Sequence, residues 1–213
     1  MRKIIKGIIN RTWKPIVERY LLKTRVYNFR GISISVSPDV FHPGFFFSTK
    51  LLISFLEKQN LERKKFLEMG CGSGLVSVFA AKQHAIVTAC DISPASVLCT
   101  TENAKKNNAT ITVLQSDLFS DIPSQQFDII AVNPPYYKKH PANIAENAWY
   151  CGENLEYFSR FFQHAESFLT PSSVIVMVLS DECDLGGIQA IALENKLSFE
   201  KVFQKRTAWE KGF

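Results

Sequence analysis

The sequence has no uninterrupted apolar run of the roughly 20 residues that a transmembrane helix requires. Its first ten residues are basic and their apolar runs are only two residues long, so they do not resemble a secretory signal peptide. The five cysteines include no C-x-x-C pair, and the four histidines lack the spacing of metal ligands. We therefore predict no metal site, no membrane contact and a reduced, cytoplasmic chain.

Positive charge is concentrated at the N-terminus. Residues 1–30 hold nine lysines and arginines against the single acid Glu18, a net charge of +8, whereas the whole chain has only +5. Apolar residues between 3 and 24 recur at intervals of three and four, which predicts an amphipathic helix kinked at Pro15. We divide the chain into this basic helical segment, residues 1–30, and one domain, residues 31–213. Such a segment favours an acidic partner such as nucleic acid, although a solvated helical face has the same composition.

The 213 residues otherwise have the composition of an ordinary globular protein, with 46% apolar and 21% charged residues. From residue 65 onward, short apolar segments alternate with segments of helical periodicity. This alternation predicts an α/β fold, a parallel sheet with helices on both faces. The predicted strands are 65–69, 85–91, 110–117, 127–135 and 174–180, with a closing strand at 198–209 that need not be parallel, and the predicted helices are 75–83, 93–108, 157–169 and 185–195.

The segment before this alternating region has weaker signals. Ile32, Ile34 and Val36 alternate with polar residues, which predicts a short strand or one arm of a hairpin. A turn at residues 43–44 follows, and then a helix that Ser48 or Thr49 caps and that runs to about residue 58.

Three glycines lie at alternating positions where the first strand of the alternating region ends. The segment reads E-M-G-C-G-S-G from Glu68 to Gly74. Glycine lacks a Cβ, so the backbone can turn tightly here and approach a ligand closely. The helix that follows presents free N–H groups to a carboxylate or a phosphate. Dinucleotide sites use G-x-G-x-x-G instead, so this spacing indicates a different cofactor.

Acidic residues end the next two strands. Asp91 can bind both hydroxyls of a ribose, while Asp117 offers a carboxylate to an exocyclic amine and Leu118 a backbone amide to a ring nitrogen. Ligands of open α/β sheets bind outside the carboxyl ends of the strands, so these groups belong to one site. Together they describe an adenosine with a small zwitterionic tail and no pyrophosphate, which is S-adenosylmethionine.

E-x-G-x-G-x-G with these two downstream acids resembles the class I S-adenosylmethionine-dependent methyltransferases, from about residue 66 to residue 179. The resemblance implies a Rossmann-like sheet of seven strands, the last of them antiparallel. It also implies that the glycines face the methionine moiety, Asp91 the ribose, and Asp117 and Leu118 the adenine. The candidate cofactor-binding residues are Glu68, Gly70, Cys71, Gly72, Gly74, Asp91, Ile92, Asp117, Leu118, Asn133 and Thr49.

The fourth strand of the region ends in N-P-P-Y, and these four residues are the candidate catalytic group: Asn133, Pro134, Pro135 and Tyr136. A planar –NH2 group is a poor nucleophile because its lone pair is delocalised. The side-chain oxygen of Asn133 and the carbonyl of Pro134 can accept its two hydrogens and direct the lone pair toward a methyl donor. The prolines fix the backbone, and Tyr136 offers a flat surface. The motif resembles motif IV of methyltransferases that act on adenine N6, cytosine N4 or the glutamine amide.

Two segments outside the motif bear on the identity of the acceptor. The segment 146–156 resembles the part of release-factor glutamine methyltransferases that shapes the amide pocket, so a protein glutamine is the leading hypothesis. Residues 43–49 depart from that family, because they lack the acid of its P-x-x-D/E-T element. The alternative is adenine N6 in RNA or DNA, with Phe45, Phe46 and Phe47 stacking an extruded base and the basic segment holding phosphates. A non-catalytic binding module would not need N-P-P-Y. We expect a monomer.

Overall fold

The structure, a computed structural model, describes residues 22–204. This part of the chain begins with a β-hairpin. Strand β1, Arg25–Phe29, pairs antiparallel with β2, Ile32–Val36, through a two-residue turn in which both residues have positive φ. The prediction of a helical segment over residues 1–30 is therefore wrong for residues 25–29. These residues form a strand in which Tyr27 and Phe29 are partly buried, whereas Val26 and Asn28 are exposed. The predicted helix at residues 3–24 lies almost wholly outside the described residues.

The inner strand of the hairpin confirms the predicted alternation, because Ile32, Ile34 and Val36 are all buried. Its free edge faces helix α4, Pro94–Lys106. Two asparagines, one in α4 and one at its C-terminal end, bond to this edge. The Asn103 amide accepts from the N–H of Ser35 (2.7 Å) and donates to its carbonyl (2.8 Å). Asn107, just beyond the helix, makes the same pair of bonds with Ser33 (3.3 and 2.9 Å). Side-chain amides thus take the place of a neighbouring strand.

The central sheet confirms the predicted α/β class. Its five strands are β3 (Lys65–Met69), β4 (Ile86–Asp91), β5 (Ile111–Gln115), β6 (Phe127–Val132) and β7 (Leu169–Met177). All neighbours are parallel and the order is β5-β4-β3-β6-β7. Along the chain, β4 and β5 are added on one side of β3, and β6 and β7 are then added on its other side. This reversal creates a crevice at the carboxyl ends of β3 and β6, where ligands of such sheets bind.

The predicted seven strands with an antiparallel last one are not found in the described part of the chain, where the sheet has five strands. Residues 198–204, the first part of the predicted closing strand, adopt no regular secondary structure. Phe199, Val202 and Phe203 are exposed, and their spacing of three and one does not place them on one face of a strand.

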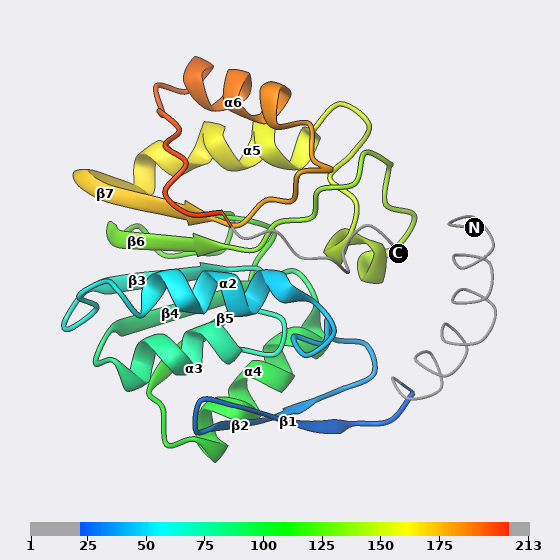
Figure 1. Cartoon of the computed structure of the whole chain (residues 1–213), viewed down its shortest axis with the longest axis vertical. Coiled ribbons are helices and arrows are strands. Elements are labelled where there is room, and N and C mark those ends of the chain that lie inside the picture. The colour runs from blue at the N-terminus through cyan, green and yellow to red at the C-terminus, as the bar shows by residue number, and fades with distance from the viewer. Residues whose placement is uncertain (1–21, 205–213) are drawn as a thin grey trace.

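Helices cover both faces of the sheet, as predicted. Figure 1 shows α5 (Glu156–Ala165) and α6 (Leu185–Glu194) together beside β7, while α2 (Phe47–Leu56), α3 (Leu75–Lys82) and α4 lie on the other side of the molecule. Short 3-10 helices occupy Ile144–Ala148 and Glu166–Phe168. Of the helices in residues 22–204, none is long and apolar enough to cross a membrane.

Two helix starts test the predicted caps. Pro94 occupies the first turn of α4, within the predicted helix 93–108, and the Ser93 side chain caps that helix by accepting from the N–H of Ser96. Helix α2 begins earlier than predicted: its N-cap is Phe46, with no side-chain cap bond, rather than Ser48 or Thr49. The Phe46 ring packs on two other aromatic rings, so tertiary packing rather than capping fixes this end.

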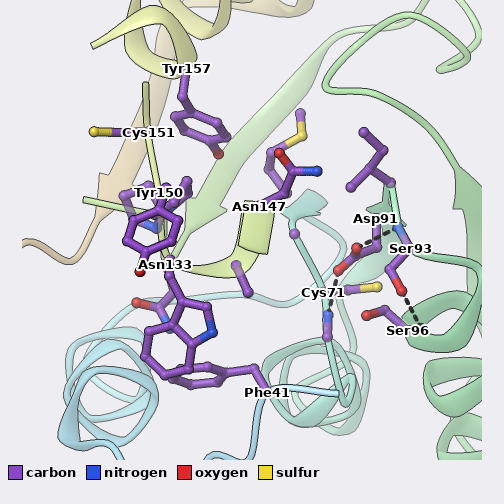
Figure 2. Close-up of a pocket in the computed structure, with 18 of the residues that line it drawn as sticks. Phe41, Cys71, Asp91, Ser93, Ser96, Asn133, Asn147, Tyr150, Cys151 and Tyr157 are labelled. Carbon is purple, nitrogen blue, oxygen red and sulfur yellow. Dashed lines mark hydrogen bonds between the residues drawn. The ribbon is translucent and has the colours of Figure 1, made fainter. Parts of the chain in front are cut away.

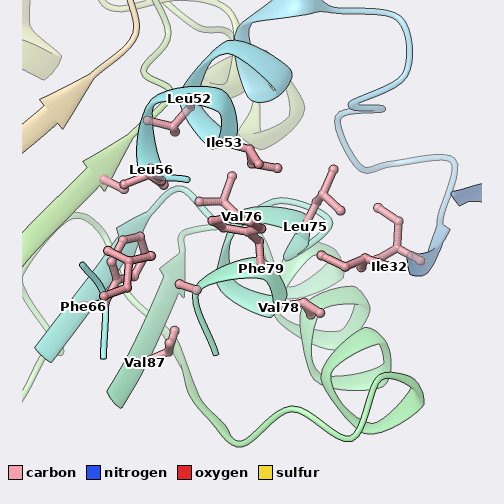
Figure 3. Packing of buried hydrophobic residues seen from close by; sticks show 14 of the residues in the cluster. Ile32, Leu52, Ile53, Leu56, Phe66, Leu75, Val76, Val78, Phe79 and Val87 are labelled. Carbon is pink, nitrogen blue, oxygen red and sulfur yellow. The ribbon is translucent and has the colours of Figure 1, made fainter. Parts of the chain in front are cut away.

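Strand periodicity divides the core into two hydrophobic clusters, one on each face of the sheet. In β3, Phe66 packs with α2 and α3, whereas its neighbour Leu67 packs with α5 and α6. Figure 3 shows the first cluster, in which Phe66 and Val87 of the sheet meet the apolar side of α3 and residues of α2 and β2. The sheet is thereby held from both faces, which fixes the strand ends that carry the predicted site residues.

Candidate active site

A cavity of about 420 Å³ opens at the carboxyl ends of the strands, at the crevice between β3 and β6. It brings together residues that are far apart in the sequence. The predicted residues that line it are Thr49, Glu68, Gly70, Cys71, Gly72, Asp91, Ile92, Asp117, Leu118, Asn133, Pro134, Pro135 and Tyr136. Gly74 does not belong to this lining. Figure 2 shows part of the cavity, with Asn133 and Asp91 among the residues that surround it.

The glycine loop between β3 and α3 turns through left-handed backbone conformations, with φ of 73° at Gly70 and 51° at Gly72. The N–H groups of Gly70 and Cys71 both donate to the carbonyl of Cys90 (2.9 Å each), which ties the loop to the end of β4. Gly74 serves helix packing instead, because a Cβ there would lie 2.8 Å from Cγ2 of Thr100 on α4.

Asp91 connects the glycine loop to the next strand end. Its Oδ2 accepts from the N–H of Gly72 and its Oδ1 from the N–H of Ser93, both at 2.9 Å (Figure 2). Burial raises the pKa of this carboxyl, and the two backbone N–H donors act in the opposite direction. Because Asp91 also lines the cavity, the carboxylate that shapes the loop also faces any ligand beside it.

The hydrogen bonds of the Glu68 side chain are to helix α3. The side chain is buried, and its Oε2 accepts from both the N–H (2.7 Å) and the hydroxyl of Ser77, in the first turn of α3. A carboxylate is favoured at a helix N-terminus, but burial dominates and raises the pKa of Glu68 to about 8. The side chain is therefore mostly neutral at pH 7.

This burial leads to a prediction about stability. From pH 4.5, the ordinary pKa of the group, to about pH 8, the folded protein holds a proton on Glu68 that the unfolded chain releases. The unfolded state then binds fewer protons, so the free energy of unfolding falls as pH rises, by up to about 1.4 kcal/mol per pH unit. Urea denaturation across this range is expected to give a steeper fall for the wild type than for Glu68→Gln, which keeps an acceptor for Ser77. Glu102→Gln, at an exposed position of α4, serves as the control; equal slopes for the wild type and Glu68→Gln would contradict the prediction.

The third strand end carries a charged pair. Asp117 follows β5, and its Oδ2 accepts from Nη2 of Arg160 on α5 at 2.7 Å. Leu118 next to it has a left-handed backbone (φ 53°), and its carbonyl accepts from the Ser116 hydroxyl at 2.7 Å. Both Asp117 and Arg160 line the cavity. The sequence pattern selected Asp117 but missed Arg160, because nothing in the sequence indicates that α5 crosses this strand end.

The N-P-P-Y segment follows β6 at the centre of the cavity. Pro134 and Pro135 are buried, while Asn133 is half-buried and its side-chain amide makes no hydrogen bond to any residue in the described part of the chain. The segment is anchored just beyond the motif: the N–H of Tyr137 donates to the Trp149 carbonyl, and the N–H of Cys151 to the Tyr137 carbonyl, both at 3.0 Å. The motif and the 146–156 segment therefore form one wall.

Aromatic rings form a second part of the cavity wall. Phe41 and Trp149 line it with ring centroids 5.3 Å apart, and Phe46 packs against both, at 4.5 and 5.0 Å. The predicted stacking run of residues 45–47 does not line the cavity. Phe45 packs on His42 instead, so it is Phe41, which no pattern distinguished, that faces a ligand. Asn147, in the predicted segment 146–156, also lines the cavity, as does Tyr157, which was missed (Figure 2).

The lining is acidic overall. Among the described residues, its charged side chains include Asp39, Asp91, Asp117 and Glu156 against one lysine or arginine, Arg160, while Glu68 is mostly neutral. Such a cavity attracts a positively charged ligand and repels phosphates. Among residues 22–204, no cluster of three or more His, Cys, Asp or Glu side chains could hold a metal ion.

The order of the sheet and the site at its reversal define an α/β protein with a ligand-sized crevice at the carboxyl ends of its strands. The chain belongs to the methyltransferase small domain family, which it matches over residues 32–209. It is 38% identical over 112 residues to a putative protein N5-glutamine methyltransferase of Methanocaldococcus jannaschii, covering 52% of this chain and 54% of that protein. It is 31% identical over 133 residues to the release factor glutamine methyltransferase of Geobacter sulfurreducens, covering 62% and 45%. The chain thus spans about half the length of these curated relatives.

A solved structure shares the fold. The 16S rRNA N2 G1207 methyltransferase of Thermus thermophilus, in complex with AdoMet and guanosine, superimposes with a TM-score of 0.64 at 21% identity, covering 81% of this chain and 45% of that one. At this level of identity the likeness concerns the fold of the domain.

Proposed function

We propose that this chain is an S-adenosylmethionine-dependent N-methyltransferase that acts on a planar amide or amine nitrogen. The observation that carries the proposal is the Asn133 amide, which faces the cavity without a partner among the described residues and stands between β6 and two buried prolines. A half-buried amide held on a rigid backbone is suited to bind a group that the protein itself does not supply.

The cavity fits the cofactor on two counts. The glycine loop leaves open space at Gly70 and Gly72, where an added Cβ would meet no atom within 4 Å apart from the adjacent residues, and Asp91 beside it can bind the ribose hydroxyls. The acidic lining also suits a ligand that carries a sulfonium and an ammonium group. Asp117 and Leu118 would hold the adenine, with Cys71, Ile92 and Thr49 completing the walls. When bound, S-adenosylmethionine supplies an electrophilic methyl group.

The chain's own residues perform the positioning. The Asn133 side-chain oxygen and the Pro134 carbonyl each accept one hydrogen of the acceptor –NH2 and so direct its lone pair into the cavity. Pro134 and Pro135 provide no competing N–H donors, and the Tyr136 ring gives the planar group a flat surface. The site needs no general base before transfer, since the nitrogen becomes acidic once it carries the methyl group.

A protein glutamine is our leading acceptor, as in the proteins named protein N5-glutamine and release factor glutamine methyltransferase that this chain resembles. The charges around the cavity support a neutral amide over a polyanion. Beside the acidic lining, Lys138 pairs with Asp184 (3.0 Å) and Lys139 with Glu146 (3.7 Å), so these cations are already engaged. The alternative, adenine N6 in RNA or DNA, rests on the net charge of +8 in residues 1–30. We further propose a cytoplasmic monomer, in keeping with the free thiols of its five cysteines.

One labelling experiment distinguishes the acceptors. Extract from a strain that lacks the gene is incubated with the purified full chain and methyl-labelled cofactor, then divided between protease and nuclease. We expect the label to become soluble with protease and to survive nuclease, and amino-acid analysis to yield N5-methylglutamine. Label released only by nuclease would exclude glutamine as the acceptor and favour adenine. The Asn133→Ala protein, incubated in parallel, controls for other methyltransferases in the extract.

A further inference from the structure

The ion pair between Asp117 and Arg160 is well formed, but a contribution to folding stability does not explain it. Asp117 follows β5 and Arg160 lies on α5, and Nη2 of Arg160 donates to Oδ2 of Asp117 at 2.7 Å. Their side chains are 45% and 51% exposed, respectively. Ion pairs this exposed contribute little to folding, because water screens them and both side chains lose freedom. The pair nevertheless lies in the cavity lining, where it can affect a ligand.

Arg160 occupies only one of the two oxygens of Asp117. Within residues 22–204, no group donates to Oδ1. The backbone around Asp117 is fixed, since the Ser116 hydroxyl donates to the Leu118 carbonyl and accepts from the N–H of Asp121 (3.0 Å). Rotation of the Asp117 side chain is the remaining freedom, and the bond from Arg160 restricts it.

We propose that Arg160 is a positioning residue for nucleobase recognition: it holds the Asp117 carboxylate so that Oδ1 accepts a hydrogen from the exocyclic amine of the cofactor's adenine. This inference rests on the proposed function, because it requires an adenosyl ligand in this cavity. The held carboxylate favours a 6-amino base, which donates to it, and disfavours a 6-oxo base, whose oxygen would face it lone pair to lone pair. Arg160 thereby contributes to cofactor specificity without contacting the reacting atoms.

The test compares two probes that differ only in the 6-amino group, S-adenosylhomocysteine and its analogue with unsubstituted purine in place of adenine, titrated calorimetrically into the full chain. For the wild type we expect the adenosyl ligand to bind at least about tenfold more tightly. Arg160→Gln is expected to reduce this ratio by about fivefold, mostly through weaker binding of the adenosyl ligand. Arg160→Lys, which retains the charge, is expected to keep most of the ratio. Lys196→Gln breaks an exposed ion pair with Glu166 that does not line the cavity, and it should leave the ratio unchanged.

Each contrary outcome has a distinct meaning. Equal losses for both ligands in Arg160→Gln would overturn the inference, because a merely structural role weakens both alike. An unchanged ratio in that variant would also overturn it, while leaving the proposed function intact. If the wild type bound both ligands equally, Asp117 would not recognise the amine, and Arg160 would have no role in such recognition. A wild type that binds neither ligand would overturn the proposed function as well.

Discussion

Replacing Asn133 with alanine is expected to lower the turnover number by at least about 100-fold while leaving cofactor affinity within about twofold of the wild type. The side-chain amide has no partner in the described part of the chain, so its removal leaves no protein group unsatisfied and should not disturb folding. What is lost is one of the two acceptors that orient the planar nitrogen. Since that orientation matters most in the transition state, the loss falls on the rate rather than on binding.

The measurement combines single-turnover kinetics on a glutamine-containing substrate with calorimetric titration of S-adenosylhomocysteine. Asn28→Ala is a matched control, because Asn28 is an exposed asparagine of β1 that does not line the cavity. If the rate and the cofactor affinity fell together in Asn133→Ala, the residue would belong to the cofactor site rather than to the acceptor site. If neither changed, the assignment of the motif would be wrong.

Replacing Asp91 with asparagine is expected to raise the dissociation constant of S-adenosylhomocysteine by about 10- to 100-fold. The carboxylate accepts from Gly72 and Ser93 and, in the proposed complex, from the ribose as well. An amide has a single acceptor oxygen, so it cannot satisfy all of these donors.

Asp91→Asn also weakens the attachment of the glycine loop, so its melting temperature has to be measured beside its affinity. Asp128→Asn gives the comparison, because Asp128 likewise accepts a backbone N–H, that of Lys65 (2.8 Å), but lies outside the cavity lining. We expect Asp128→Asn to lower stability without changing the affinity. An unchanged affinity in Asp91→Asn would remove Asp91 from the cofactor site.

Sequence patterns predicted the parts of the molecule that depend on local order along the chain. Alternating strands and helices predicted the parallel sheet, and residues at strand ends, such as Asp91 and Asn133, were selected because the ends of parallel strands meet at one edge. Contacts across the chain have no such signal. Phe41 and Arg160 reach the cavity only because a loop and α5 cross it, and neither crossing follows from spacing. Gly74 and Glu68 fit the motif, yet their contacts are with helices α4 and α3.

The amide contacts between α4 and the hairpin have a consequence for self-association. A strand with an open edge can recruit a strand from another molecule and begin aggregation, and natural proteins protect such edges. Here the edge of β2 is closed by Asn103 and Asn107, whose amides satisfy the backbone of Ser35 and Ser33. The Asn103 amide also donates to the Ser73 carbonyl in the glycine loop (2.9 Å). The group that keeps this edge from recruiting a second chain is therefore bonded directly to the loop that lines the cavity.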